Sequence, residues 1–154
     1  MLYYTEVGLS HLEVPNETAL CIYISGCPNR CINCHYPQLQ LTDYGDILKH
    51  HFSKLIDLYS NMATCIVFLG EGKGAVDDRK ELLYYCDLTH ARDMKTCLYS
   101  GRDTHIEDWM QKFDYIKLGR YDPKYGPLNV PTTNQRMFKK IQDKYIDITN
   151  HFWT

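Results

Sequence analysis

The sequence lacks the marks of several large protein classes. It contains no apolar run long enough for a membrane helix, and residues 1–6 lack the basic start and apolar segment of a signal peptide. It also lacks a basic run, and its formal net charge of −2 leaves no electrostatic footprint for nucleic acid. We therefore expect a cytoplasmic protein that binds neither membranes nor nucleic acid.

Nothing in the sequence divides the chain into parts. It has no repeat, low-complexity tract or linker, and 44% of its 154 residues are hydrophobic against 23% charged. A chain of this length and composition can bury a core of its own. We expect a single domain over residues 1–154.

Cysteine is plentiful by contrast, with seven residues. Without a secretion signal, metal or redox chemistry is favoured over a disulfide framework. Four cysteines are scattered, and we expect them to be small buried apolar side chains: Cys21, Cys65, Cys86 and Cys97. The other three form a C-x3-C-x2-C motif: Cys27, Cys31 and Cys34.

The clustered cysteines offer three thiolates to one metal centre. Iron–sulfur clusters are normally held by four cysteines, so a cluster here would keep one iron open to a non-protein ligand. The alternatives are a zinc site, completed by His35 or a remote residue, and incidental cysteines. Structural zinc sites favour two separated ligand pairs, and the sequence has no second pair. The motif therefore favours a [4Fe-4S] cluster.

Short apolar runs that end at glycine alternate with helix-like segments. The runs predict four buried strands, at residues 19–25, 65–69, 95–100 and 114–118. Helices are expected at 44–60 with Thr42 as the cap, at 77–86, and around 106–113 with Asp103 or Thr104 as the cap. A short strand is expected at 2–7. Residues 135–148 fit either a hairpin turned at 143–144 or a helix and a strand.

This alternation predicts an α/β protein with a parallel sheet and right-handed crossovers. The loops that follow the four strands would then gather at one edge of the sheet, where ligands bind in such folds. A complete eight-unit barrel needs about 250 residues. The sequence therefore predicts a partial, open (βα) barrel with a mostly parallel, curved sheet.

The cysteine motif after a first strand resembles the cluster loop of the radical S-adenosylmethionine superfamily. Within it, the chain is similar to the activating proteins of anaerobic (class III) ribonucleoside-triphosphate reductases. The segments that carry this likeness are 25–35, 98–101, 119–121, 126–128 and 132–136, the last with Asn134-Gln135-Arg136. Residues 14–17 depart from the family, which commonly has a glycine-rich segment with an arginine there.

The resemblance implies a specific activity. The open iron would chelate the amino and carboxylate groups of S-adenosylmethionine, and one electron would release a 5′-deoxyadenosyl radical. That radical would take hydrogen from a glycine of the anaerobic ribonucleotide reductase catalytic subunit, its protein substrate, and leave a glycyl radical. A low-potential donor such as flavodoxin or ferredoxin would supply the electron. The resemblance also admits a homodimer.

It also implies which residues bind the cofactor. Gly70-Glu71-Gly72 stands where the superfamily often has Gly-Gly-Glu, and the altered order leaves open which residue makes the contact; an ordinary glycine turn is the alternative. Ser100 is either a contact at the end of the third strand or a plain strand-end serine. Contacts through the backbone are expected beside the cluster from Asn33, Cys34 and His35. No catalytic residue is expected beyond the cluster ligands.

Two other functions stay open. The first is an activase of another glycyl radical enzyme, such as the pyruvate formate-lyase type, although many of those carry extra cluster cysteines. The second is a non-enzymatic iron–sulfur carrier or zinc-binding module. Either module would require a fourth protein ligand, and none is evident in the sequence.

Overall fold

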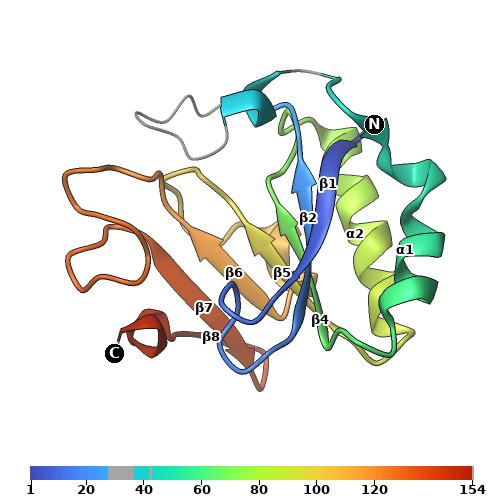
Figure 1. Cartoon of the computed structure of the whole chain (residues 1–154). Helices are drawn as coiled ribbons and strands as arrows, with labels where there is room; N and C mark the ends of the chain where they lie inside the picture. The colour runs from blue at the N-terminus through green and yellow to red at the C-terminus, as the bar shows by residue number, and fades with distance from the viewer. Residues whose placement is uncertain (28–36, 42, 154) are drawn as a thin grey trace.

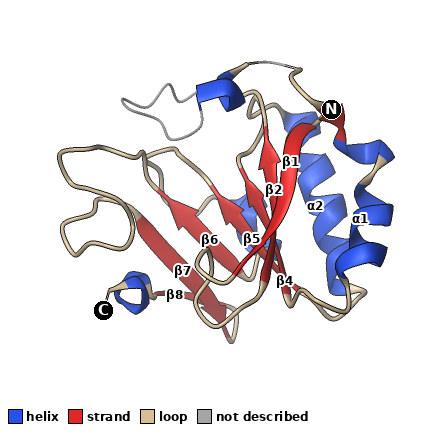
Figure 2. Ribbon diagram, viewed as in Figure 1, coloured by secondary structure: helices blue, strands red, loops and turns tan. Residues whose placement is uncertain are grey.

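The computed structural model describes residues 1–27, 37–41 and 43–153. These residues form one open sheet of eight strands, in the order β3-β1-β2-β4-β5-β6-β7-β8. Both α-helices lie on the same side of the sheet (Figures 1 and 2), and α2 (Val76–His90) contacts β5. Among the described residues, no helix has the length and apolar character needed to cross a membrane.

The four central strands are those predicted from the apolar runs, and they are parallel. They are β2 (Ala19–Ile24), β4 (Cys65–Leu69), β5 (Lys95–Tyr99) and β6 (Tyr115–Leu118). Most of their residues are buried and only Lys95 is exposed, as expected for strands that are covered on both faces.

The outer strands are antiparallel. β1 (Tyr3–Ser10) pairs with β2 and with β3 (Asp46–Ile47), while β7 (Arg136–Ile141) pairs with β6 and with β8 (Lys144–Asp147). Four of the seven strand pairs are thus antiparallel. The α/β class and the open edge are confirmed, but the expectation of a mostly parallel sheet is wrong. The flanking strands could pair antiparallel because their connections do not need a crossover helix.

The prediction of a helix at 44–60 is wrong for the first half of that range. Asp46–Ile47 forms β3 and Leu48–His50 a 3-10 helix, so the α-helix α1 covers only Phe52–Tyr59. Gly45 explains the difference: it has a φ of 100°, and a β-carbon there would lie 2.1 Å from the carbonyl oxygen of Tyr4. Glycine thus allows the chain to pass close to β1, and the following residues Asp46 and Ile47 pair with Tyr4 and Tyr3. Thr42, the expected cap, lies outside the described residues.

The other helices also differ from expectation. The helix α2 (Val76–His90) is longer than the predicted 77–86. The third is a five-residue 3-10 helix, η3 (Asp108–Lys112), and its N-cap is Glu107 rather than Asp103 or Thr104. It is short because Phe113 is already extended and leads directly to β6.

The C-terminal segment is the hairpin, one of its two predicted forms. Gln142 and Asp143 connect β7 to β8 with positive φ values of 50° and 65°. Two left-handed residues in a two-residue turn match the twist of the flanking strands. The turn therefore fits the predicted position to within one residue.

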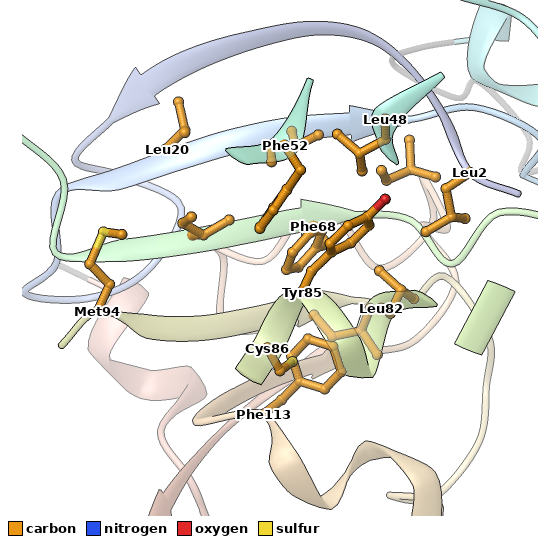
Figure 3. Packing of buried hydrophobic residues seen from close by; sticks show 14 of the residues in the cluster. Leu2, Leu20, Leu48, Phe52, Phe68, Leu82, Tyr85, Cys86, Met94 and Phe113 are labelled. Atoms are coloured by element: carbon orange, nitrogen blue, oxygen red, sulfur yellow. The ribbon is translucent and has the colours of Figure 1, made fainter. Parts of the chain in front are cut away.

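Two apolar cores cover the two faces of the sheet. On the helix face, the Phe52 and Tyr85 rings stack with centroids 4.1 Å apart, and Phe68 lies 6.0 Å from each (Figure 3). On the other face, the β1–β2 loop and the C-terminus supply Val14 and Ile148.

All four scattered cysteines are buried in these cores, as predicted. Cys86 lies on the helix face, and Cys21, Cys65 and Cys97 lie on the other. Burial raises the pKa of the Cys21 and Cys86 thiols to about 12. These side chains are therefore neutral thiols at physiological pH.

Candidate functional site

The loops that follow the parallel strands meet at one edge of the sheet, as predicted. A β-carbon on Gly26, after β2, would lie 3.5 Å from Cγ of Lys73, after β4. A β-carbon on Gly70 would lie 3.2 Å from the carbonyl oxygen of Ile24. The backbone after β2 therefore lies directly against the turn after β4.

The start of the cysteine loop is tied to the chain that follows it. The Cys27 amide donates to the Leu39 carbonyl at 2.8 Å, and the Gly26 amide donates to the Leu41 carbonyl at 3.0 Å. Nearby, the Lys73 ammonium lies 3.0 Å from the Asp43 carboxylate. These contacts hold Cys27 at the carboxyl end of β2.

Most of the predicted cluster and cofactor residues of this loop fall outside the structure's described part. They are Cys31, Asn33, Cys34 and His35. Within residues 1–27, 37–41 and 43–153, no group of three or more His, Cys, Asp or Glu is placed to hold a metal ion. Cys27 is the one predicted metal ligand among the described residues. Its position suits a ligand at this edge, because it is only partly buried and borders an apolar-lined cavity beside the strand ends.

The predicted cofactor turn at Gly70-Glu71-Gly72 has a backbone that requires glycine. Gly70 and Gly72 have φ values of 121° and 69°. A β-carbon on Gly72 would lie 2.6 Å from Leu2 Cδ2 and 2.9 Å from Asp78 Oδ2. Asp78, in the first turn of α2, also accepts a hydrogen bond from the Lys73 amide at 3.2 Å. The turn is therefore packed closely against α2.

The side chains of the other two predicted contact residues bind each other. The Ser100 hydroxyl donates to Glu71 Oε2, and both side chains are buried. Arg102 donates to the same carboxylate from Nε at 3.0 Å and from Nη2 at 2.8 Å. These internal bonds occupy Glu71 and Ser100, so the backbone of the turn is the part left to contact a ligand.

Arg102 binds a second carboxylate at the same time. Its Nη1 and Nη2 atoms donate to Glu107 at 3.0 Å and 2.7 Å, and the Trp109 indole donates to Glu107 at 2.8 Å. The hydrogen bonds from Arg102 lower the pKa of Glu107 to about 2. Sequence reasoning missed Arg102, because a charged residue in a loop gives no signal of its partners.

A cavity also lies at the carboxyl ends of the parallel strands. Its volume of about 530 Å³ is within the range of ordinary ligand pockets. Cys27 and Gly70 line it, as do Glu13 and Leu12 from the β1–β2 loop. Apolar walls dominate it, and they come from several loops and strands: Ile24, Leu39, Leu69, Pro127, Leu128 and Phe152. The contribution of the β1–β2 loop had no signal in the sequence.

Charged groups lie in the floor of this cavity. Lys117 in β6 is only 8% exposed, donates to the Gly119 carbonyl at 3.3 Å and lies 5.3 Å from the centre of the Tyr99 ring. The Tyr99 hydroxyl donates to the Glu13 carbonyl. Burial raises the pKa of the Glu13 carboxyl, while Tyr99 and Lys117 oppose that shift. The sequence feature that could have drawn attention to Lys117 is its place as a charged residue inside an otherwise apolar strand.

The C-terminal segments that carried the resemblance lie side by side. Gln135 Nε2 donates to the Gly119 carbonyl at 3.2 Å, and Asn134 Nδ2 donates to the Arg120 carbonyl at 2.9 Å. Gln135 and Tyr121 line the 530 Å³ cavity, whereas Arg136 lines a separate cavity of about 690 Å³ with Asp103 and His105. Neighbouring residues of the Asn-Gln-Arg segment thus line two different cavities.

Comparison of the whole chain with protein-family models, with curated proteins and with solved structures gives no match. The family assignment therefore stays a prediction from the sequence motifs.

Proposed function

We propose that the chain is a radical S-adenosylmethionine activase that generates a glycyl radical on an anaerobic ribonucleotide reductase, and that its open sheet is a partial (βα) barrel. The observation that supports this is the position of Cys27. The first cysteine of the motif lies at the carboxyl end of β2, next to a glycine turn and at the border of a ligand-sized cavity.

Under this proposal Cys27, Cys31 and Cys34 hold the [4Fe-4S] cluster. When bound, the cluster would pass one electron from flavodoxin or ferredoxin to S-adenosylmethionine, whose sulfur–C5′ bond would break to give methionine and a 5′-deoxyadenosyl radical. Hydrogen transfer from the α-carbon of the reductase glycine would then yield 5′-deoxyadenosine and the glycyl radical. One electron from the donor would thus be consumed for each glycyl radical formed.

The chain's own residues would bind and orient the cofactor. The peptide groups of residues 70–72 would hold the methionine amino group, and only glycine allows a backbone to come so close to its neighbours. The apolar walls of the cavity would enclose the adenosine and exclude water from the reacting centre. Lys117 adds a buried positive charge at the floor of the same cavity.

The open sheet supports a protein substrate. β8 and β3 are the two edges of the sheet, and they do not pair with each other. Loop residues Tyr121, Pro127, Leu128 and Asn129 form one wall of the cavity. A loop of a partner protein can therefore approach from the side, which a closed barrel would restrict.

The test is anaerobic reconstitution with iron and sulfide, followed by addition of dithionite and S-adenosylmethionine. We expect 5′-deoxyadenosine from the wild type, and a glycyl radical signal in electron spin resonance once the reductase is added. Cys31→Ala should lose both products. Cys86→Ala is the matched control, since it removes a cysteine buried in the core on the helix face.

Several results would contradict the proposal. One is the absence of 5′-deoxyadenosine from protein with a fully reconstituted cluster. Another is tight binding of one zinc ion per chain with no capacity for iron, which would favour the zinc module. A radical on a pyruvate formate-lyase-type enzyme but not on the reductase would favour the other class of activase.

A further inference from the structure

We propose that Arg102 is a positioning residue that fixes the backbone of the turn at Gly70-Glu71-Gly72 by holding the Glu71 carboxylate. The fixing of the turn follows from the geometry alone. That the turn binds S-adenosylmethionine rests on the proposed function. Under this proposal Arg102 acts on the cofactor through Glu71 and the turn, and not by a contact of its own.

The bond between Arg102 and Glu71 is a two-point contact. Nε donates to Oε2 at 3.0 Å and Nη2 donates to Oε1 at 2.8 Å. A planar guanidinium paired with a carboxylate in this way fixes orientation as well as distance. Glu71 is only 7% exposed, so water cannot replace the arginine without a change in the turn.

The guanidinium is itself held from the other side. It donates to both oxygens of Glu107, and Glu107 caps η3 and accepts from Trp109. The Arg102 carbonyl also accepts a hydrogen bond from the Gly119 amide, after β6, at 3.0 Å. Arg102 therefore joins the ends of β4, β5 and β6 to the start of η3.

The turn depends on such a contact because of its sequence. Glu71 is the one residue of Gly70-Glu71-Gly72 with a side chain, and glycine backbones lose the most conformational freedom on folding. Asp78 holds the turn from the α2 side through the Lys73 amide. Arg102 holds it from the β5 side, and nothing else in the described residues donates to Glu71 except Ser100.

The turn faces Cys27 across a small hollow. A hollow of about 40 Å³ is lined by Cys27, Gly70, Gly72 and Arg102, together with Glu71, Gly74 and Gly101. A rotation of the Glu71 side chain would move the peptide groups that line this hollow. A change at Arg102 would therefore alter, through Glu71, the backbone that lies beside Cys27.

The first test measures hydrogen exchange of the amides at 70–74 by mass spectrometry, in Arg102→Lys and Arg102→Gln. Both variants lose the two-point contact, and Arg102→Lys keeps the charge. We expect these amides to exchange about tenfold faster or more in both variants. Arg79→Gln is the matched control. Arg79 lies 3.9 Å from Glu107 and 5.1 Å from the Trp109 ring, but no bond joins it to Glu71 among the described contacts.

The second test measures kinetics on the reconstituted protein. If Arg102 positions the turn, KM for S-adenosylmethionine should rise about tenfold, the effect of about 1.4 kcal/mol of binding. The value of kcat for 5′-deoxyadenosine formation should change less than KM. A shift in the cluster's electron spin resonance signal on adding S-adenosylmethionine should need correspondingly more of it.

Two outcomes would overturn the inference. One is unchanged exchange at 70–74 in folded Arg102→Lys, which decides the matter if Arg102→Gln does not fold. The other is equally fast exchange in Arg79→Gln. A wild type that makes no 5′-deoxyadenosine would instead overturn the proposed function, and the exchange result would still decide whether Arg102 fixes the turn.

Discussion

The alanine variants of three glycines should separate steric crowding from backbone strain at the candidate site. Gly72→Ala places a methyl group 2.6 Å from Leu2 Cδ2 and 2.9 Å from Asp78 Oδ2. Gly74→Ala, two residues on, meets nothing within 4 Å, although its φ of 75° is as left-handed as that of Gly72. Gly8→Ala in β1 also meets nothing and has no positive φ.

The expected magnitudes follow from these distances. A left-handed alanine costs about 1–2 kcal/mol, and this is all that Gly74→Ala should lose. Gly72→Ala carries the same strain plus overpacking of about 1–3 kcal/mol, because Leu2 is buried in the core and Asp78 is held by the Lys73 amide. Gly8→Ala should gain about 0.5–1 kcal/mol, because glycine inside a strand is less stable than alanine by roughly that amount.

The assay is urea unfolding of the metal-free protein, followed by far-ultraviolet circular dichroism and extrapolated linearly to water. The order of stability should be Gly8→Ala, then Gly74→Ala, then Gly72→Ala. The same unfolding midpoint for Gly72→Ala and Gly74→Ala would refute the close packing of the turn against α2. It would also remove the basis for a rigid cofactor-binding backbone at this position.

Other predictions test the cores and the arginine contact. Cys21 and Cys86 should resist alkylation at pH 8 in the folded protein and react on unfolding, because burial keeps them protonated; prompt labelling in native conditions would contradict this. Because Arg102 lowers the pKa of Glu107 to about 2, the stability from this pair is complete above the usual carboxyl pKa and is lost as pH falls from there toward 2. Glu107→Gln should flatten that acid-side decline in urea midpoint, and a parallel decline would argue against the pair. Phe52→Ala should cost about 3–5 kcal/mol in the same assay, since its ring stacks on Tyr85, and a loss under about 1 kcal/mol would refute that packing.

The central strands were predictable because each is a largely apolar run with a glycine within two residues of its end, and burial on both faces leaves that pattern in the sequence. The strand-end edge followed from the same observation. The error at 44–60 has a different origin. The inward apolar spacing of Leu48 and Phe52 suited a helix, but the close approach of Gly45 to β1 is a tertiary contact that local spacing does not record.

The candidate site was predictable in its position and not in its contacts. The sequence placed Glu71 and Ser100 at neighbouring strand ends, and both lie there. It did not indicate that their side chains would bind each other and Arg102, because a hydrogen bond between residues 31 positions apart leaves no periodic pattern. The place of Glu13 in the lining of the 530 Å³ cavity was also unpredictable, because the residues that it meets there are far from it in the sequence.

The two backbone bonds at the base of the cysteine loop have a consequence for metal affinity. The bond from Cys27 to Leu39 closes the chain between them into a ring. In an unfolded chain, bringing together two ends separated by this many residues costs about 2 kcal/mol in chain entropy. Folding of the sheet offsets this loss of entropy, so it does not have to be offset by the binding of a metal ion. Thiolates within the ring would therefore bind a metal with one loop closure fewer to complete, and the affinity of the site depends partly on two bonds that contain no sulfur.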